Sequence, residues 1–328
     1  MGCQMQVLSR SNWEKLAHTH VATVGPWLKA FLDRRVRRQP HPVYDFLFVY
    51  YSYSPTKLQQ WHPGIGFSLE DAALDDNTAL EIPQANRVSG NRQDRVRFSR
   101  EAYSRFEHDR EHGSGYHSIF CDPEKISVSQ RERMEWSRDM LTRTANRPGN
   151  FGCFGLQEWA MVYGGREVRH QHMAPLRLKQ SEIDRVVRGL PIACSHYDAF
   201  RFFADDARPL NVIQPNAADR ADFEQPACIH ANMDLYKWAF KAMPWVGTDL
   251  LMKCFYLARD AREIDMRASP YDLAAFGIDD PICIETEVGR TAYRDHQREL
   301  ADRAKPLRQS LINRLAAILD ECKIKPTE

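Results

Sequence analysis

The stretch HANMDLYKWAFKAM at residues 230–243 and the stretch TDLLMKCFYLARDAREI at residues 248–264 decide the fold class. Both carry apolar residues at the three- and four-residue spacing of an amphipathic helix. In the second stretch, one face of the predicted helix collects Leu251, Cys254, Phe255, Ala258 and Ala261. The two stretches therefore predict a pair of consecutive helices.

Helical patterns also lie on both sides of this pair. Downstream, a long terminal helix is predicted from apolar residues spaced by threes and fours, namely Leu300, Ala304, Leu307, Leu311, Leu315 and Ile318. Upstream, we expect helices at 129–144, 154–163 and 182–188. Motifs of the capping-box type predict helix starts at Ser11, Ser68, Ser129 and Ser181. We therefore predict a mainly α fold, a compact multi-helix domain with a few short strands, and keep an α+β fold as the alternative.

The domain organisation follows from the segments between these helices. Residues 45–53 (DFLFVYYSY) are continuously apolar and predict a buried helix or a central strand. The run NRPGN at 146–150 interrupts the helical pattern and marks a candidate boundary. We expect a helical N-terminal region at 1–150 with a long irregular segment at 54–128, and a helical domain at 151–328 that carries the functional site. The alternative is that both parts form one continuous core.

Composition is that of a globular protein, with 328 residues, 43% hydrophobic residues and a net charge of +1. No apolar run approaches the roughly 20 residues that cross a bilayer, and the amino terminus lacks the apolar region of a signal peptide. The eight cysteines include no Cys-x-x-Cys pair, which predicts free buried thiols. We expect a cytoplasmic protein without membrane contact.

Several functional classes lose support because their motifs are missing. The chain has no Walker loop, no Gly-x-Gly-x-x-Gly after a strand, no His-Glu-x-x-His and no Gly-x-Ser-x-Gly. Its near-neutral charge gives no overall attraction to a phosphate backbone. Basic runs at 34–38 and 87–100 are expected to be solvated surface, with a nucleic-acid contact as the alternative.

Polar groups inside otherwise apolar segments are the strongest functional signal. Burying such a group without a partner costs roughly 2–7 kcal/mol, so these groups are expected to meet one another or a ligand. We predict that they face a common pocket with aromatic walls. The candidate catalytic residues are Glu158, His196, Asp198, His230 and Asp234.

Local structural functions are the alternatives for three of these residues. Asp198 follows Ser195 at capping-box spacing and could satisfy a helix start. His230 and Asp234 are four residues apart on one predicted helix, which suits a hydrogen bond between the two side chains.

Metal binding is one chemistry that fits these parts. His196, Asp198 and His230 have the composition of a two-histidine, one-carboxylate iron site. Glu158 and His170 could instead complete a site within a helix bundle. The candidate ligands for Fe or Zn are thus Glu158, His170, His196, Asp198, His230 and Asp234.

Hydrolysis of a glycosidic bond to a base is the second chemistry, and it requires no cofactor. A carboxylate of Asp198, Asp234 or Glu158 would activate water or stabilise the sugar cation. An alkylated purine is already cationic, and stacking on an aromatic wall then adds about 0.5–2 kcal/mol. The candidate substrate-binding residues are Trp159, Tyr163, Tyr197, Arg201, Tyr236, Lys237, Trp238 and Arg267.

Longer motifs point to a family. The chain contains PHPVYDFLFVYYSY, FGLQEWAMVY, CSHYDAFRFF, EQPACIHANMDLYKWAFK, IDMRASPYDL and IETEVGR. Over residues 41–64 and nearly all of 150–310, it resembles a bacterial family that carries the name 3-methyladenine DNA glycosylase and is not of the helix-hairpin-helix type. The resemblance implies a DNA-repair hydrolase that cleaves the N-glycosidic bond of an alkylated purine, with DNA as its partner. A metal-dependent enzyme acting on a small molecule and a non-catalytic ligand-binding protein are the alternatives.

Overall fold

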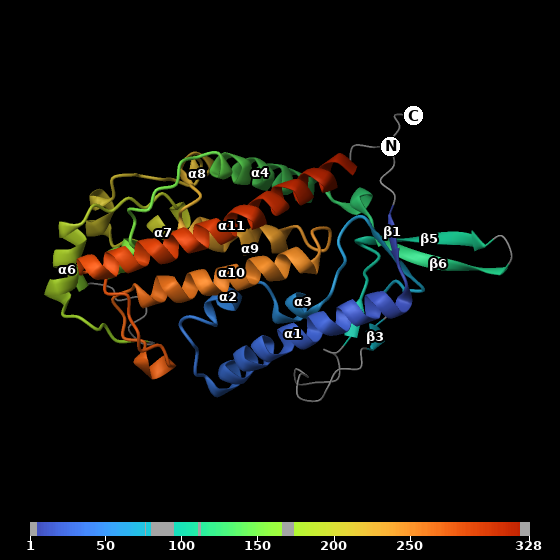
Figure 1. Ribbon diagram of the computed structural model, residues 1–328, viewed down its shortest axis with the longest axis horizontal. Coiled ribbons are helices and arrows are strands. Elements are labelled where there is room, and N and C mark those ends of the chain that lie inside the picture. The colour runs from blue at the N-terminus through green and yellow to red at the C-terminus, as the bar shows by residue number, and fades with distance from the viewer. Residues whose placement is uncertain (1–4, 76, 80–94, 111–112, 166–173, 322–328) are drawn as a thin grey trace.

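The computed structural model describes residues 5–75, 77–79, 95–110, 113–165 and 174–321. This part of the chain is predominantly helical, with a small sheet at one end, which confirms the prediction of a mainly α fold (Figure 1). None of the described helices is both long and apolar enough to span a membrane.

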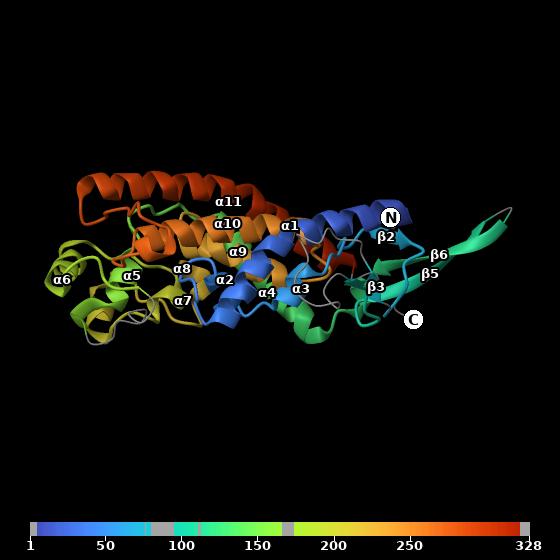
Figure 2. The same cartoon turned by 90° about the horizontal axis from the view of Figure 1, so that it is seen from below.

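The helical body is built around the pair that the sequence predicts. α9 (Ile229–Lys241) and α10 (Thr248–Arg267) pack against each other, and α11 (Glu287–Glu321) packs against both and against α4 (Val128–Ala145). On the other side of α10 lie α1 (Arg10–Arg37), the single turn α2 (Phe46–Val49) and α3 (Pro55–Gln59) (Figures 1 and 2). Residues 45–53 thus begin as a helical turn and continue as an irregular segment, in which Ser52 has a positive φ of 55°.

Helix starts are less well predicted than the helices themselves. α4 is opened by a capping box of Ser127 and Gln130, two residues before the predicted Ser129. α1 begins at Arg10, so Ser11 lies inside it. Ser181 likewise lies inside α6 (Gln180–Gly189), whose Glu182 side chain accepts a hydrogen bond from the backbone N–H of Lys179.

The helix start at Ser68 is wrong, because Ser68 lies in a strand. The main sheet has the order β1 (Gln6–Leu8), β2 (Phe67–Glu70), β6 (Gly113–Cys121), β5 (Tyr103–Arg110). The β1–β2 pair is parallel, whereas β2–β6 and β6–β5 are antiparallel. A second sheet pairs β3 (Asn77–Ala79) with β4 (Arg95–Arg97).

Much of the segment 54–128, expected to be irregular, is therefore β-structure. The sequence signal is weak because β5 and β6 project from the body as a ribbon (Figure 2). Arg105, Phe106 and Glu107 are consecutive and all exposed, so β5 lacks the alternation of a half-buried strand at these positions.

One hydrophobic core connects both sides of residue 150. Trp13 and Leu28 of the N-terminal part belong to the same buried cluster as Trp159, Phe255 and Leu311. The cysteines in the described part of the chain are free thiols, most of them buried: Cys121, Cys153, Cys194, Cys228, Cys254 and Cys283.

Candidate functional site

A small cavity lies where α2 and the irregular segment after it meet the first turns of α9 and the last turns of α10. Two short helices, α5 (Leu156–Met161) and α7 (Tyr197–Phe200), complete its walls. Its volume is about 140 Å³. The lining residues are Phe46, Tyr50, Tyr51, Glu158, Met161, His196, Asp198, Ala199, Phe202, His230, Met233, Asp234 and Arg262. We call this space the closed cavity.

The aromatic walls of the closed cavity come mainly from residues 46–51. The rings of Phe46, Tyr50 and Tyr51 pack against one another with centroids 4.8–6.2 Å apart. The guanidinium carbon of Arg262 lies 4.0 Å from the centroid of the Phe46 ring. Phe202 adds a fourth ring from the segment after α7. These rings offer flat apolar surfaces beside charged groups.

Asp234 stands at the centre of a first charged cluster. Its carboxylate is 1% exposed and accepts hydrogen bonds from the Tyr51 hydroxyl at 3.0 Å and from Lys237 Nζ at 3.0 Å. Nε2 of His196 lies 3.3 Å from the same carboxylate, and Arg220 Nη2 lies 3.4 Å from it. Burial alone would raise the pKa of Asp234, but Lys237 and the other donors hold it below its usual value.

Two further carboxylates share the cations of this cluster. Asp198 accepts hydrogen bonds from Lys237 at 3.0 Å and from Arg220, which lies on α8 (Arg220–Phe223). Glu224 accepts one from Arg220 Nε at 2.6 Å. Burial raises the pKa of Asp198, but the charges of Lys237 and Arg220 outweigh it and lower this pKa to about 2. We call His196, Asp198, Arg220, Glu224, Asp234 and Lys237 the paired cluster.

A second cluster on α5 and α10 has fewer donors. Nη1 of Arg262 donates to Oε1 of Glu158 and to Oδ2 of Asp265, both at 2.8 Å. All three side chains are buried, and Oδ1 of Asp265 also accepts from Gln157. Two carboxylates thus share one cation. Burial, and next the charge of Glu158, raise the pKa of Asp265 to about 7. We call Glu158, Arg262 and Asp265 the unbalanced cluster.

Glu158 carries the decisive detail of this cluster. Its Oε2 atom is buried and accepts no hydrogen bond from any of the described residues. A buried charged oxygen left without a donor is costly, and native structures rarely keep one without a reason. Because Glu158 also lines the closed cavity, a ligand there could supply the missing partner.

His230 lies between the two clusters, beside His196 of the paired cluster. The rings of His196 and His230 have centroids 5.5 Å apart. Nε2 of His230 lies 3.7 Å from Oδ2 of Asp265, and burial followed by the charge of His196 lowers the pKa of His230 to about 3. The predicted pairing of His230 with Asp234 along one helix is wrong, since Asp234 pairs with His196 from another element.

All five predicted catalytic residues line the closed cavity: Glu158, His196, Asp198, His230 and Asp234. The alternative that Asp198 caps a helix is wrong, because His196 precedes the first turn of α7 without a side-chain cap and Asp198 binds cations instead. Lys237, predicted to bind substrate, contacts Asp198 and Asp234 in the paired cluster.

All eight predicted substrate-binding residues lie outside the lining of the closed cavity. Trp159 is a core residue that donates to the carbonyl of Ala268, and Tyr236 is fully buried between other aromatic rings. Trp238 packs against Trp136 and the Lys237 ammonium group. Arg267 pairs with Asp280, and Tyr163 contacts Arg188. Aromatic residues in apolar segments are most often packed in a core, and that explains these errors.

Tyr197 and Arg201 occupy a different place. They line a surface hollow of about 420 Å³ together with Phe200, Phe202 and Arg208. Phe202 also lines the closed cavity, so the hollow lies directly beside it.

A metal site with the predicted ligands is only partly assembled. Ligand atoms of His196, Glu224 and Asp234 lie within 4.8 Å of one another, and this is the one such group of three among the described residues. Asp198 and His230, predicted ligands, are not in it, and His170 lies outside the described residues. The carboxylates of this group also make ion pairs with Arg220 and Lys237.

Sequence reasoning missed the residues that complete the site, above all Tyr51, Arg262 and Asp265. A signal for the last two exists. Arg262 and Asp265 follow Ala258 and Ala261 at helical spacing, so the apolar stripe of α10 continues into two charged residues. Charges placed on a buried stripe must find partners, which marks the last turns of α10 as part of the site.

Comparison with protein-family models, with curated proteins and with solved structures gives no match to this chain.

Proposed function

We propose that the closed cavity binds a cationic alkylated purine such as 3-methyladenine and that the protein hydrolyses the N-glycosidic bond of this base in DNA. The observation that carries the proposal is the buried, unpartnered Oε2 atom of Glu158, a residue that lines an aromatic-walled cavity. A carboxylate oxygen without a donor favours a positively charged ligand, and the rings of Phe46, Tyr50 and Tyr51 favour a flat one. The family that the sequence resembles is named for the same reaction.

The size of the cavity limits what could enter. An apolar cavity of about 150 Å³ holds one benzene molecule, so 140 Å³ suits a small flat ring system but not a whole nucleotide. A base would therefore have to enter alone, rotated out of its strand while the sugar and phosphate stay outside. Arg201 and Arg208, in the adjoining surface hollow, are suitably placed to contact that phosphate.

In this proposal the unbalanced cluster has a catalytic function and the paired cluster has a structural one. Glu158 either removes a proton from the attacking water or stabilises the positive charge that develops on the sugar. The bond between the sugar and the base breaks, the base leaves with the electron pair of that bond, and its positive charge is thereby neutralised. The paired cluster holds α7 and α9 in place, and with them the wall opposite Glu158.

The experiment is release of free base from methylated duplex DNA by the purified protein, with Glu158→Gln as the test variant. Loss of a general base or of an equivalent electrostatic contact lowers the rate about 10²- to 10⁴-fold. Glu299→Gln on the exposed face of α11 is the matched control and should keep the wild-type rate. Absence of base release by wild-type protein, or an unchanged rate in Glu158→Gln, would contradict the proposal.

A metal-dependent enzyme acting on a small molecule is the second candidate, favoured by the proximity of His196, Glu224 and Asp234. These ligand types suit iron or zinc. Metal analysis of the purified protein separates the two candidates. One equivalent of iron or zinc that is lost in Glu224→Gln would favour the second. Binding of the methylated base without its release would instead favour a non-catalytic ligand-binding protein.

A further inference from the structure

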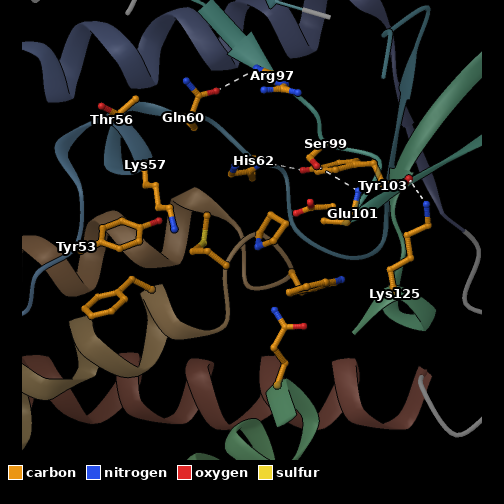
Figure 3. A pocket seen from close by; sticks show the side chains of 16 residues that line it. Tyr53, Thr56, Lys57, Gln60, His62, Arg97, Ser99, Glu101, Tyr103 and Lys125 are labelled. Carbon is orange, nitrogen blue, oxygen red and sulfur yellow. Dashed lines mark hydrogen bonds between the residues drawn. The ribbon is translucent and has the colours of Figure 1, made fainter. Parts of the chain in front are cut away.

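A larger cavity, which we call the open cleft, lies between the small sheets and the turn that joins α9 to α10 (Figure 3). Its volume is about 910 Å³, within the range of roughly 300–1,000 Å³ in which proteins bind small molecules. It shares no lining residue with the closed cavity. Neither the predicted site residues nor the proposed function accounts for it.

One wall of the open cleft is aromatic and apolar. Tyr53 and Phe240 are stacked with ring centroids 4.6 Å apart and an interplanar angle of 20°. Met243, Pro244 and Trp245 continue this wall along the turn after α9. A flat ring could lie against such a surface without needing a hydrogen bond.

The other side of the open cleft is basic. Lys57 on α3, Arg97 at the end of β4 and Lys125 line it, and Glu101 is the single acidic residue among the lining residues (Figure 3). Lys125 donates to the backbone carbonyls of Arg100 and Tyr103, both at 2.7 Å. Because these acceptors are neutral, the charge of Lys125 is not cancelled by them.

Arg97 makes a long ion pair within the described part of the chain. Its partner there, Asp75, lies 3.7 Å away and makes a closer ion pair with Arg100 at 2.8 Å. Lys57 is exposed and makes no ion pair with a carboxylate of the described residues, and in Figure 3 it projects into the cleft beside Tyr53. Three basic side chains from separate elements thus line one cleft that has an aromatic wall.

We infer that the open cleft is a second ligand site, which binds a nucleotide-type ligand with its flat ring against Tyr53, Phe240 and Trp245 and its phosphate on Lys57, Arg97 and Lys125. Arginine and lysine side chains bind phosphate oxygens by charge-assisted hydrogen bonds, and aromatic rings stack on any base. The ligand is either a free nucleotide or one nucleotide of a single strand, since both present the same groups. Arg97 belongs to the basic run at 87–100, for which a nucleic-acid contact was the alternative.

Isothermal titration calorimetry tests this inference with three probes: adenosine monophosphate, a single-stranded DNA tetranucleotide and inorganic phosphate. We expect saturable binding of at least one of the first two, and weaker binding of phosphate because it lacks a ring. Lys57→Ala and Arg97→Glu should each weaken binding by roughly tenfold or more, as expected for a charge-assisted hydrogen bond. A tetranucleotide that binds more tightly than the mononucleotide identifies a strand as the source, and the reverse order identifies a free nucleotide.

Arg185→Glu is the matched control for Arg97→Glu. Arg185 is exposed on α6, at the end of the molecule opposite the sheets, and its reversal should leave binding unchanged (Figure 1). The inference is overturned if neither nucleotide probe binds, or if the cleft variants bind like the control. If circular dichroism shows that Arg97→Glu does not fold, binding by the Lys57→Ala variant still tests the inference, because Lys57 is exposed. The inference does not depend on the proposed function, because Glu158→Gln should leave binding in the open cleft intact.

Discussion

The two charged clusters beside the closed cavity both combine carboxylates with arginine but differ in how their charges are matched. In the paired cluster, Asp234 has contacts from a tyrosine, a lysine, an arginine and a histidine. In the unbalanced cluster, Glu158 and Asp265 share the single guanidinium of Arg262. This difference shows that burial of a carboxylate does not by itself indicate function. A buried carboxylate oxygen that lacks a hydrogen-bond partner is the more informative observation.

Asp234→Ala should have the largest effect on stability. Removing a fully paired buried carboxylate leaves Lys237 and Arg220 with uncompensated charge, which typically costs about 3–5 kcal/mol. We expect a loss of this size in the free energy of unfolding, measured with urea. Asp205→Ala, at a carboxylate whose side chain is 93% exposed, is the control and should change it by less than about 0.5 kcal/mol.

Glu158→Gln sharpens the same comparison. Its Oε2 has no donor to lose, and the amide oxygen of the glutamine could still accept from Arg262. We therefore expect a clearly smaller loss of stability than in Asp234→Ala. Equal losses in the two variants would remove the distinction between the clusters.

Tyr51→Phe should have an intermediate effect. The hydroxyl of Tyr51 donates to Asp234, and a hydrogen bond to a charged group contributes about 1.5–3 kcal/mol. The ring stays in place, so the aromatic wall is kept. Urea unfolding measures the change, and Tyr256→Phe at a half-buried hydroxyl of α10 is the control. A loss below about 0.5 kcal/mol would mean that this hydrogen bond contributes little to the paired cluster.

The pH dependence of stability should have opposite signs for the two clusters. The pKa of Asp265 is raised to about 7 in the folded protein, so its ionisation makes the folded state less stable as pH rises from about 4 to about 7. The slope is at most about 1.4 kcal/mol per pH unit. The pKa of Asp198 is lowered to about 2, so its contribution to stability is lost as pH falls from about 4 to about 2.

Comparison of wild type with Asp265→Asn and with Asp198→Asn isolates these contributions from those of other titrating groups. Relative to Asp265→Asn, the wild type should become less stable between pH 4 and 7. Relative to Asp198→Asn, it should become less stable below pH 4. The same sign in both comparisons would contradict the assignment of charges to the two clusters.

The sequence predicted which polar residues gather at one cavity better than it predicted the contacts among them. Glu158, His196, Asp198, His230 and Asp234 could be singled out because polar groups in apolar helices must meet partners or a ligand. The individual pairs could not, since spacing along one helix suggested His230 with Asp234, whereas packing between elements pairs His196 with Asp234. The spacing of apolar residues along a helix shows which face is buried, but it does not show which other element packs against that face.

The strands of the two sheets were not predicted, for a related physical reason. β5 reads YSRFEHDR, and a ribbon exposed on both faces needs no alternation of apolar and polar residues. Its pairing with β6 is set by backbone hydrogen bonds, which leave little trace in composition. The open cleft depends on residues from α3, β4 and the turn after α9, and no local pattern brings these segments together.

Binding of a cationic ring and of its neutral isostere tests the central claim most directly, namely that Glu158 leaves the closed cavity selective for a flat cation. N-methylpyridinium and toluene have the same shape and differ in charge. Wild-type protein should bind the cation roughly tenfold more tightly or better, since a cation about 4 Å from a carboxylate gains on the order of 4 kcal/mol at an effective dielectric constant of about 20. Glu158→Gln removes the charge and should lose this part of the preference. Equal affinity for the two ligands, or a preference that is undiminished in Glu158→Gln, would contradict the claim.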